Sequence, residues 1–469
     1  MNFEAVIGLE LHIQMKTKSK MFSSAPVSFG NEPNTNVSAH DMAFPGTMPV
    51  VNKQAVINAI RVCSALHMDI DSELWFDRKN YFYSDLPKGY QITQQRRPIG
   101  SNGYLDILDK RIGIERLHIE EDTCKQLHLN DCTLLDYNRA GIPLVEIVSK
   151  PEIRNGDEAM KFVERIRSIV SFLGVSDGKM EEGSLRCDVN VSIKPIGSRG
   201  FGTKVEIKNL NTLANIKKAI DYEIRRQEMV VLSGNRVHQE TRRFDETKKE
   251  TVLMRIKTDE IDYKCFTEPN IPPIKLSKEF IREALSSSPE LAEQRYSRYR
   301  RLGLSEYDSN LLVSDKETSD YFDAVIKEGA NPKLAANWIL VDVQSVLNKK
   351  NISISEFVIN PYKLAQLIKL IEDGIVYNKQ ARELFNKMLE EDIDPKAFVE
   401  QFKTSSLSEQ ELETVIKQVL DENPQSITDY KNGKDKAVGY LVAQVMKATQ
   451  KKANPALINE MIVKELKVR

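Results

Sequence analysis

The chain has 469 residues, of which 41% are apolar and 29% charged, and its mean hydropathy is −0.41. This length predicts about three domains at roughly 150 residues each, and no apolar run approaches the ~20 residues that span a bilayer, which argues against a membrane protein. The 67 basic and 68 acidic residues nearly cancel, so the chain as a whole lacks the positive excess typical of nucleic-acid binding.

Targeting and redox signals are sparse. Residues 1–20 carry Glu4, Glu10 and His12 among their apolar positions, so they lack the basic and apolar regions of a signal peptide. The cysteines form no CxxC pair and stand at Cys63, Cys124, Cys132, Cys187 and Cys265. We therefore predict a cytoplasmic protein without a cleaved leader, in which the cysteines are reduced core thiols.

The first 292 residues alternate short apolar segments with turn residues, which predicts a mostly antiparallel sheet with a few helices. One helix is expected over 157–173, where apolar residues recur at helical spacing and Gly174 supplies the stop. Strands resume soon after this helix.

The pattern becomes helical from about residue 293 and remains so to the end. A polar stretch begins near 403 and separates two helical blocks. Their clearest apolar stripes are Leu364, Leu367, Ile368 and Ile371, followed by Gly374, and Val438, Leu441, Val442, Val445 and Met446. We predict an α+β protein with a sheet domain over 1–292, a helical domain over 293–402 and a small helical tail over 403–469.

Three predicted strands present polar residues on one face, because side chains alternate along a strand. These strands are "AVIGLELHIQM", "RCDVNVSI" and "KVEIKNL". The polar residues are Glu10, His12 and Gln14 in the first, Arg186, Asp188 and Asn190 in the second, and Lys204, Glu206 and Lys208 in the third.

A further acidic cluster, Glu120, Glu121 and Asp122 in "LHIEEDT", has no assignable face because consecutive strand residues point both ways. If the polar faces converge, they combine carboxylates, an imidazole and basic side chains. That combination suits Mg²⁺ with a phosphate-bearing ligand, as in phosphoryl transfer. The alternative is a solvated sheet face, on which Glu and Lys alternate because that side meets water.

Residues 77–95, "DRKNYFYSDLPKGYQITQQ", interleave basic and aromatic side chains. Such a segment can stack a base while its cations meet phosphates. A strand pair joined by a Pro-Lys-Gly turn explains the same composition. The loop "GSRGFGTK" at 197–204 lacks the phosphate-loop spacing, so we predict a hairpin turn there.

The C-terminal segment has the clearest charge asymmetry. From Lys431 to Arg469 there are nine basic and three acidic residues, a local balance of +6. This balance is suited to contacts with a phosphate backbone, although a solvated helix face explains it equally well.

Many segments of the chain, in order, resemble those of the B subunits of bacterial aspartyl/glutamyl-tRNA amidotransferases. They include "VIGLELHIQ", "FDRKNYFYSDLPKGYQITQ", "LHIEED", "DYNRAGIPLVEIVSKP", "LGVSDGKMEEGSLRCDVNVS", "FGTKVEIKNLN", "QETRRFD", "EPNIPPI" and "GYLVAQVMKAT". This resemblance runs nearly end to end.

The resemblance implies an antiparallel-sheet cradle followed by a helical domain and a small tail. It implies that the cradle uses ATP and Mg²⁺ to phosphorylate the side-chain carboxylate of Glu-tRNA(Gln) and/or Asp-tRNA(Asn). Ammonia, released from glutamine in a glutaminase A subunit and channelled to the cradle, would displace the phosphate. A small C subunit would complete the heterotrimer.

The resemblance also assigns roles to residues of this chain. The Mg²⁺ and catalytic role falls on Glu10, His12, Glu121, Asp188 and Glu206. Contacts with ATP or substrate are implied for Lys79, Lys88, Arg186, Lys204, Lys208 and Asn209, and an ammonia path for Lys79, Tyr81 and Lys88. Contacts with the tRNA body are expected from Lys434, Lys436, Lys447, Lys451 and Lys452.

Two departures from the family pattern change the expectations. Many members carry paired cysteines that bind zinc, and the matching positions here are Ser23, Ala25, Ser38 and Asp41, so zinc is not expected. The family's "DYRYFPEPD" is "DYKCFTEPN" here, which puts Lys264 in place of an arginine and loses its bidentate geometry.

Three functions compete at this point. The first is an ATP-dependent carbon-nitrogen ligase subunit acting on aminoacyl-tRNA, with glutamine as the amido donor. The second is a non-catalytic tRNA-binding scaffold of the same complex. The third is a Mg²⁺-dependent phosphatase or nuclease that works alone.

Overall fold

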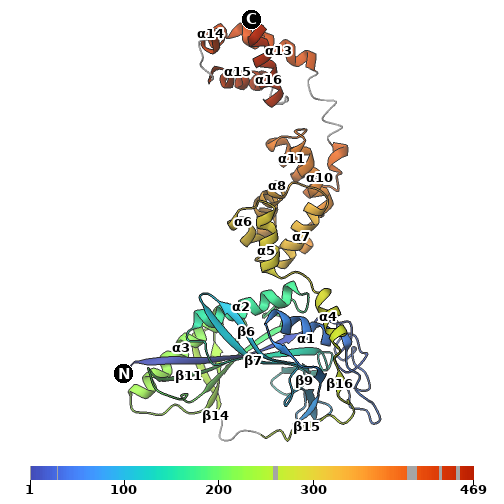
Figure 1. Cartoon of the computed structure of the whole chain (residues 1–469), viewed down its shortest axis with the longest axis vertical. Coiled ribbons are helices and arrows are strands. Elements are labelled where there is room, and N and C mark those ends of the chain that lie inside the picture. The colour runs from blue at the N-terminus through green and yellow to red at the C-terminus, as the bar shows by residue number, and fades with distance from the viewer. Residues whose placement is uncertain are drawn as a thin grey trace. The chain divides into compact units, whose positions relative to one another are not determined.

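The computed structural model describes residues 2–28, 30–256, 262–398, 409–431, 436–449 and 455–468. The chain divides into two compact units, Met1–Arg295 and Tyr296–Arg469 (Figure 1). The predicted α+β class is confirmed, because the first unit contains a large sheet and the second is helical. The expected three-domain division remains a prediction, and its second boundary, near 403, lies outside the described residues.

The described part of the first unit is built on a nine-stranded sheet with the order β14-β13-β12-β11-β1-β10-β7-β6-β2. Its strands are β1 (Phe3–Gln14), β2 (Asp69–Ile70), β6 (Gly100–Ile107), β7 (Lys110–Glu121), β10 (Pro143–Ser149), β11 (Leu185–Pro195), β12 (Val205–Lys208), β13 (Glu240–Asp245) and β14 (Glu250–Ile256). Within this described sheet, neighbouring strands are antiparallel except β12 and β13, which are parallel. The helix α3 (Leu213–Leu232) returns the chain from β12 to β13, as a parallel connection requires.

The same described residues form three smaller sheets. They consist of β3 (Glu73–Leu74) with β16 (Ile274–Lys275), β4 (Asp77–Asn80) with β5 (Tyr90–Thr93) and β15 (Phe266–Thr267), and β8 (Lys125–His128) with β9 (Thr133–Asp136). The strand pair predicted within 77–95 is confirmed, because β4 and β5 are antiparallel. The turn predicted at 197–204 is also confirmed, because it joins the antiparallel strands β11 and β12.

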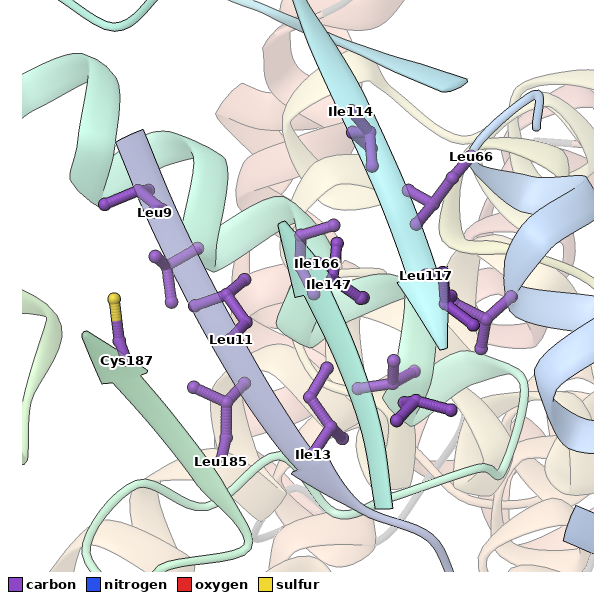
Figure 2. Close-up of a cluster of buried hydrophobic side chains, with 14 of the residues drawn as sticks. Leu9, Leu11, Ile13, Leu66, Ile114, Leu117, Ile147, Ile166, Leu185 and Cys187 are labelled. Atoms are coloured by element: carbon purple, nitrogen blue, oxygen red, sulfur yellow. The ribbon is translucent and has the colours of Figure 1, made fainter. Parts of the chain in front are cut away.

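Helices pack on the apolar face of the main sheet. They are α1 (Lys53–Ala65), α2 (Gly156–Phe172) and α3, with α4 (Lys278–Ser286) against α1. Figure 2 shows Leu9, Leu11 and Ile13 of β1 in one buried cluster with Ile166 of α2. The helix predicted over 157–173 is confirmed, and Gly174 follows it with φ +67°, a conformation that favours glycine.

All five cysteines lie in the described ranges and are free, but not all are core thiols. Cys63, Cys124 and Cys187 are buried as predicted, whereas Cys265 is half-buried and Cys132 exposed. The prediction is wrong for Cys132, because this residue lies in the turn between β8 and β9 rather than in a strand of the main sheet.

The described residues of the second unit are helical throughout. The first group comprises α5 (Ala292–Arg301), which spans the division between the units, α6 (Glu306–Leu312), α7 (Lys316–Lys327), α8 (Pro332–Asn337), a π-helical segment (Trp338–Val343), α9 (Gln344–Lys350), a 3-10 turn (Ile354–Glu356), α10 (Pro361–Glu372) and α11 (Asn378–Glu390). The second comprises α13 (Glu409–Glu422), α14 (Pro424–Lys431), α15 (Lys436–Ala448) and α16 (Pro455–Val468).

These two groups of helices bury separate apolar clusters among the described residues. The predicted stripe of α10 contributes Leu364, Leu367 and Ile368 to the first cluster, and the predicted stripe of α15 contributes Leu441 and Val445 to the second. Every helix in the described ranges is too short or too polar to cross a bilayer.

Candidate active site

The strand β1 organises the polar face of the main sheet. Its residues Leu9, Leu11 and Ile13 are buried against the helices, whereas Glu10 and His12 are half-buried on the opposite face. This alternation confirms the two-residue period predicted for the strand. Because β1 lies between β10 and β11, its polar side chains have neighbours on both sides.

The imidazole of His12 lies among three carboxylates. Its Nε2 atom is 3.3 Å from Glu146 Oε2 and 3.7 Å from both Glu10 Oε1 and Glu120 Oε1. A second imidazole, His118, has its Nε2 atom 3.2 Å from Glu146 Oε2 and 3.5 Å from Glu120 Oε2. The two imidazoles therefore share the same pair of carboxylates.

These contacts change the protonation of the cluster. Burial opposes a charged imidazole at His12, but the hydrogen bond with Glu146 and the neighbouring carboxylate charges raise the pKa of His12 to about 9. Burial likewise opposes charge at His118, and the same carboxylates raise the pKa of His118 to about 9. Burial and the charge of Glu146 raise the pKa of Glu10, whereas the two imidazoles hold the pKa of Glu146 well below its usual range despite its burial.

The cluster has the composition of a metal site. Among the described residues, the sets of three or more potential ligands whose atoms lie within 4.8 Å of one another are Glu10, His12 and Glu146, and His118, Glu120 and Glu146. Carboxylate oxygens are the ligands that Mg²⁺ prefers, and imidazole nitrogen is also accepted by Mn²⁺ and other transition metals. A cation bound here would displace the imidazole protons.

Asp188 and Glu206 continue this polar face across β11 and β12. Asp188 lies opposite Glu10 in the register of β1 and β11. The ammonium of Lys208 is 2.5 Å from Asp188 Oδ2 and 3.2 Å from Glu206 Oε1, and the hydroxyl of Thr241 donates to Glu206 Oε2 at 2.9 Å. Burial opposes the charge on Lys208, but the two carboxylates raise its pKa. The structure therefore places Glu10, His12, Asp188 and Glu206 on one continuous face.

Glu121 stands apart from these four residues. Its carboxylate accepts hydrogen bonds from Lys88 Nζ at 2.5 and 2.6 Å and from the backbone N–H of Ile92 at 3.0 Å. It is Glu120, whose direction the sequence leaves open, that contacts the imidazole of His12. Lys88 and Glu121 therefore form a buried ion pair beside the polar face.

Asp122 connects two strands of the site. Its carboxylate accepts hydrogen bonds from Gln14 Nε2 at 2.7 Å and from Arg186 Nη2 at 3.0 Å. Gln14 also lines a cavity of about 770 Å³ at the end of β1, together with Lys16, Lys18 and Arg61. The polar face thus adjoins a basic cavity through Gln14.

Comparison with known proteins assigns the chain to a family. The sequence profile of the GatB/GatE catalytic domain matches residues 5–282, and that of the GatB domain matches residues 320–466. The chain belongs to the GatB/GatE family. The resemblance inferred from the motifs is thereby confirmed.

Curated relatives match over the full length of this family member. The chain is 47% identical over 476 residues to the protein of Geobacillus thermodenitrificans (strain NG80-2) and 47% identical over 477 residues to that of Ligilactobacillus salivarius (strain UCC118), in both cases with 100% of each chain covered. It is 46% identical over 475 residues to the protein of Bacillus mycoides (strain KBAB4), again with complete coverage. All three relatives are named as the B subunit of aspartyl/glutamyl-tRNA(Asn/Gln) amidotransferase.

The remaining residues expected to contact substrate or ammonia lie on or next to β4 and β12. Lys79 Nζ is 4.8 Å from the ring centroid of Tyr263 and 6.0 Å from that of Tyr81, and burial raises the pKa of Tyr81. Lys204 and Asn209 are exposed immediately before and after β12. The residues expected to contact substrate thus come from different elements of the first unit.

Asp41, one of the four positions that the resemblance matches to zinc-binding cysteines, forms a buried ion pair with Lys20. The ammonium of Lys20, which is 0% exposed, lies 3.3 Å from Asp41 Oδ2 and donates to the carbonyl of Tyr137 at 3.2 Å. The backbone N–H of Ser38 also donates to Asp41, at 2.8 Å. The absence of zinc remains a prediction.

The lysines expected to contact tRNA are only partly described. Lys447 is exposed in the last turn of α15, and Lys436 begins that helix. Lys434, Lys451 and Lys452 lie outside the described residues.

Glu146 and His118 were not predicted from the sequence. Glu146 is a lone charge in the apolar strand "PLVEIVS", and His118 precedes Glu120 by two residues in "LHIEE". A single ionisable residue within a strand that is otherwise apolar is the signal that would have found Glu146, because a buried charge needs a partner.

Proposed function

We propose that this chain is the B subunit of a heterotrimeric tRNA-dependent amidotransferase and that the polar face of its main sheet carries the chemistry. The observation that carries this proposal is the convergence of Glu10, His12, Asp188 and Glu206 beside the ammonium of Lys208. The names of the full-length relatives support it. The protein acts in the cytoplasm on Glu-tRNA(Gln), Asp-tRNA(Asn) or both.

The proposed reaction has two steps. An oxygen of the substrate's side-chain carboxylate attacks the γ-phosphorus of ATP, and ADP leaves. Ammonia then attacks the carbonyl carbon of the acyl phosphate, inorganic phosphate leaves with the bonding electron pair, and the nitrogen loses a proton to give the amide. Both steps develop negative charge on phosphoryl oxygens, which cationic groups must stabilise.

The residues present fit a Mg²⁺ ion on the polar face, because they offer carboxylate oxygens and an imidazole nitrogen at close range. The proposed ligands are Glu10, His12, Asp188 and Glu206, and the family resemblance adds Glu121. Glu120 and Glu146 are further candidates, because their carboxylates contact His12. When bound, Mg²⁺ supplies positive charge to the phosphoryl oxygens. Lys208 holds Asp188 and Glu206 in place through its two ion pairs.

The proposed activity requires two partner subunits and tRNA. Ammonia comes from glutamine hydrolysed in the glutaminase A subunit and reaches this chain along a path that includes Lys79, Tyr81 and Lys88. The small C subunit joins the other two. The tail binds the tRNA body through its lysines, of which Lys447 is exposed.

The substitution Glu206→Gln tests the proposal in the complex of this chain with its A and C partners. The assay supplies Glu-tRNA(Gln) or Asp-tRNA(Asn), ATP, Mg²⁺ and ammonium chloride in place of glutamine. We expect the variant complex to assemble and bind tRNA but to form amide roughly 100-fold more slowly or worse, because a group that positions the reacting charges is lost. The matched control is Glu279→Gln in the exposed first turn of α4, which should retain full activity.

Two results would contradict the proposal. Unchanged amidation by the Glu206→Gln complex would exclude this face as the catalytic site and favour a scaffold that only binds tRNA. Multiple-turnover phosphate release by the isolated chain without tRNA would instead favour a phosphatase or nuclease that works alone.

A further inference from the structure

The hairpin of β13 and β14 extends the polar face beyond the residues considered above. In the parallel register of β12 and β13, Thr241 lies opposite Glu206 and Arg243 opposite Lys208. In the antiparallel register of β13 and β14, Arg255 lies opposite Thr241. Glu206, Thr241 and Arg255 therefore form a row across three strands.

A β-bulge places Arg255 in this row. The register of β13 and β14 shifts between Thr241 and Arg242, so that Arg242 lies opposite Leu253 while Thr241 lies opposite Arg255, and Met254 is the extra residue. With regular pairing, Met254 would lie opposite Thr241 and Arg255 would point to the helix-covered face. Bulges often re-aim a side chain beside a functional site, and this one puts a guanidinium in place of a thioether.

Arg255 has fewer polar contacts than Arg242 of the adjacent strand β13. Arg242 is tied to Glu240 Oε2 at 2.6 Å and donates to the hydroxyl and carbonyl oxygens of Thr251 at 3.0 and 2.8 Å. Arg255 is exposed, and its Nε atom is 3.5 Å from the hydroxyl of Thr241. Within the described ranges no carboxylate lies within 4.0 Å of the Arg255 guanidinium.

Arg243 lies on the same face, one position along β13. Its side chain is 46% exposed and its Nη1 atom is 3.8 Å from Asp245 Oδ2, a distance that leaves most of its donors open to other partners. Lys208, whose ammonium is 3.2 Å from Glu206 Oε1, is by contrast engaged by two carboxylates. Among the described residues of this part of the face, the arginines of the hairpin therefore add exposed positive charge to that of Lys204.

We propose that Arg255, assisted by Arg243, binds phosphate oxygens of the nucleoside triphosphate at the β14 edge of the polar face. This inference rests on the proposed function, because it assumes that ATP reacts on this face. A triphosphate approaching Glu206 and Asp188 meets carboxylates, and exposed guanidinium groups beside them offset that repulsion. The planar guanidinium also matches phosphate geometry with two parallel hydrogen bonds, which an ammonium does not.

The test uses the heterotrimeric complex with Arg255→Met, Arg255→Lys and Arg243→Met, assayed with saturating charged tRNA, Mg²⁺ and ammonium chloride. We expect Arg255→Met to raise the KM for ATP roughly tenfold to hundredfold, as the loss of a charge-assisted hydrogen bond implies. Arg255→Lys should fall between wild type and Met, and Arg243→Met should raise the KM less. The control Arg225→Met removes an exposed cation from α3, on the helix-covered side, and should leave the KM unchanged.

The outcomes separate this inference from the proposed function. The inference would be overturned, and the proposed function retained, if wild-type amidation requires ATP while Arg255→Met and Arg243→Met both have an unchanged KM for ATP. Weaker tRNA binding by Arg255→Met at an unchanged KM for ATP would also overturn it, because the phosphates would then belong to tRNA. A wild-type complex that amidates without ATP would overturn both. Trimer assembly and thermal unfolding, measured on each variant, confirm that the KM values compare folded proteins.

Discussion

The two faces of the main sheet share the same strands but differ in what their side chains do. On the helix-covered face, Leu9, Leu11 and Ile13 of β1 contribute only packing. On the opposite face, His12 of the same strand contacts Glu120 and Glu146 from other strands, and Glu10 contacts His12. The alternation of a single strand thus separates the apolar core from the cluster of ionisable side chains.

The polar face is itself not uniform. Toward β7 and β10, His118 and Glu146 are 2% and 8% exposed, and His118 Nε2 lies 3.2 Å from Glu146 Oε2. At the β13 and β14 end, Arg243 and Arg255 are exposed. Substitutions at the buried end should therefore affect folding, whereas substitutions at the open end should affect ligand binding.

Glu146→Gln should have the largest effect on stability, although Glu146 lies on the polar face and not in the apolar core. It removes the carboxylate that two buried imidazoles share, and breaking a buried ion pair costs about 3–5 kcal/mol. Urea unfolding of the isolated chain in EDTA measures this cost. Retention of wild-type stability would show that the imidazoles are not held by Glu146.

The same variant should alter the pH dependence of unfolding in EDTA. The pKa of His12 and His118 is raised from 6.5 to about 9 in the folded state, so their contribution is fully present below pH 6.5 and is lost as pH rises through 9. In Glu146→Gln this decline should be smaller. If the free energies of unfolding of wild type and Glu146→Gln fall equally with rising pH, Glu146 does not hold the two imidazoles in their protonated form.

Leu11→Ala should destabilise the chain by about 2–5 kcal/mol, because Leu11 is fully buried on the central strand and its truncation leaves a cavity. Amidation per folded molecule should remain unchanged, because Leu11 lies on the face opposite Glu10 and His12. The measurement pairs urea unfolding with the ammonium-dependent assay below the unfolding transition. A selective loss of activity would show that the apolar face positions the site.

Glu206→Gln should change the free energy of unfolding by only about 0.5–1.5 kcal/mol, the range of a single net hydrogen bond. The amide oxygen of glutamine can still accept from Thr241, so mainly the ion pair with Lys208 is lost. Thermal unfolding of the complex measures this change. A loss of several kcal/mol would place Glu206 among the buried structural charges instead.

Thiol labelling should perturb the protein least, and it distinguishes exposed from buried cysteines. At pH 8, Cys132 should react quickly with a disulfide reagent, because it is exposed. Cys124 should react slowly, because burial and nearby carboxylates raise its pKa to about 11, and Cys187 should be protected on the apolar face. Equal rates for all three thiols would contradict the buried positions.

The sequence predicts elements whose signal is local. The two-residue period of β1 and the helical spacing of 157–173 each depend on residues within one element, and both were found where expected. Gly174 marked a helix end because its backbone adopts φ +67°. The parallel pairing of β12 and β13 was not predicted, because it depends on the length and path of α3 rather than on either strand.

The site was predictable where its residues alternate with apolar ones, as Glu10, His12, Asp188 and Glu206 do. It was not predictable at Glu120 and Glu121, because two consecutive acids give no face and the structure separates them by pairing Glu121 with Lys88. Arg255 was hidden for a different reason. Its face depends on a bulge, and a bulge reverses the alternation that a strand pattern predicts.

The central position of β1 has a consequence for synthesis on the ribosome. The strand is translated long before its neighbours β10 and β11, and its residue Ile7 pairs with Val191. The strand therefore lacks its β11 partner until more than 190 residues have been made, and contacts this distant in sequence form slowly. We expect chaperones to engage nascent chains that end before Val191, and the Glu10 and His12 site to assemble only after that point.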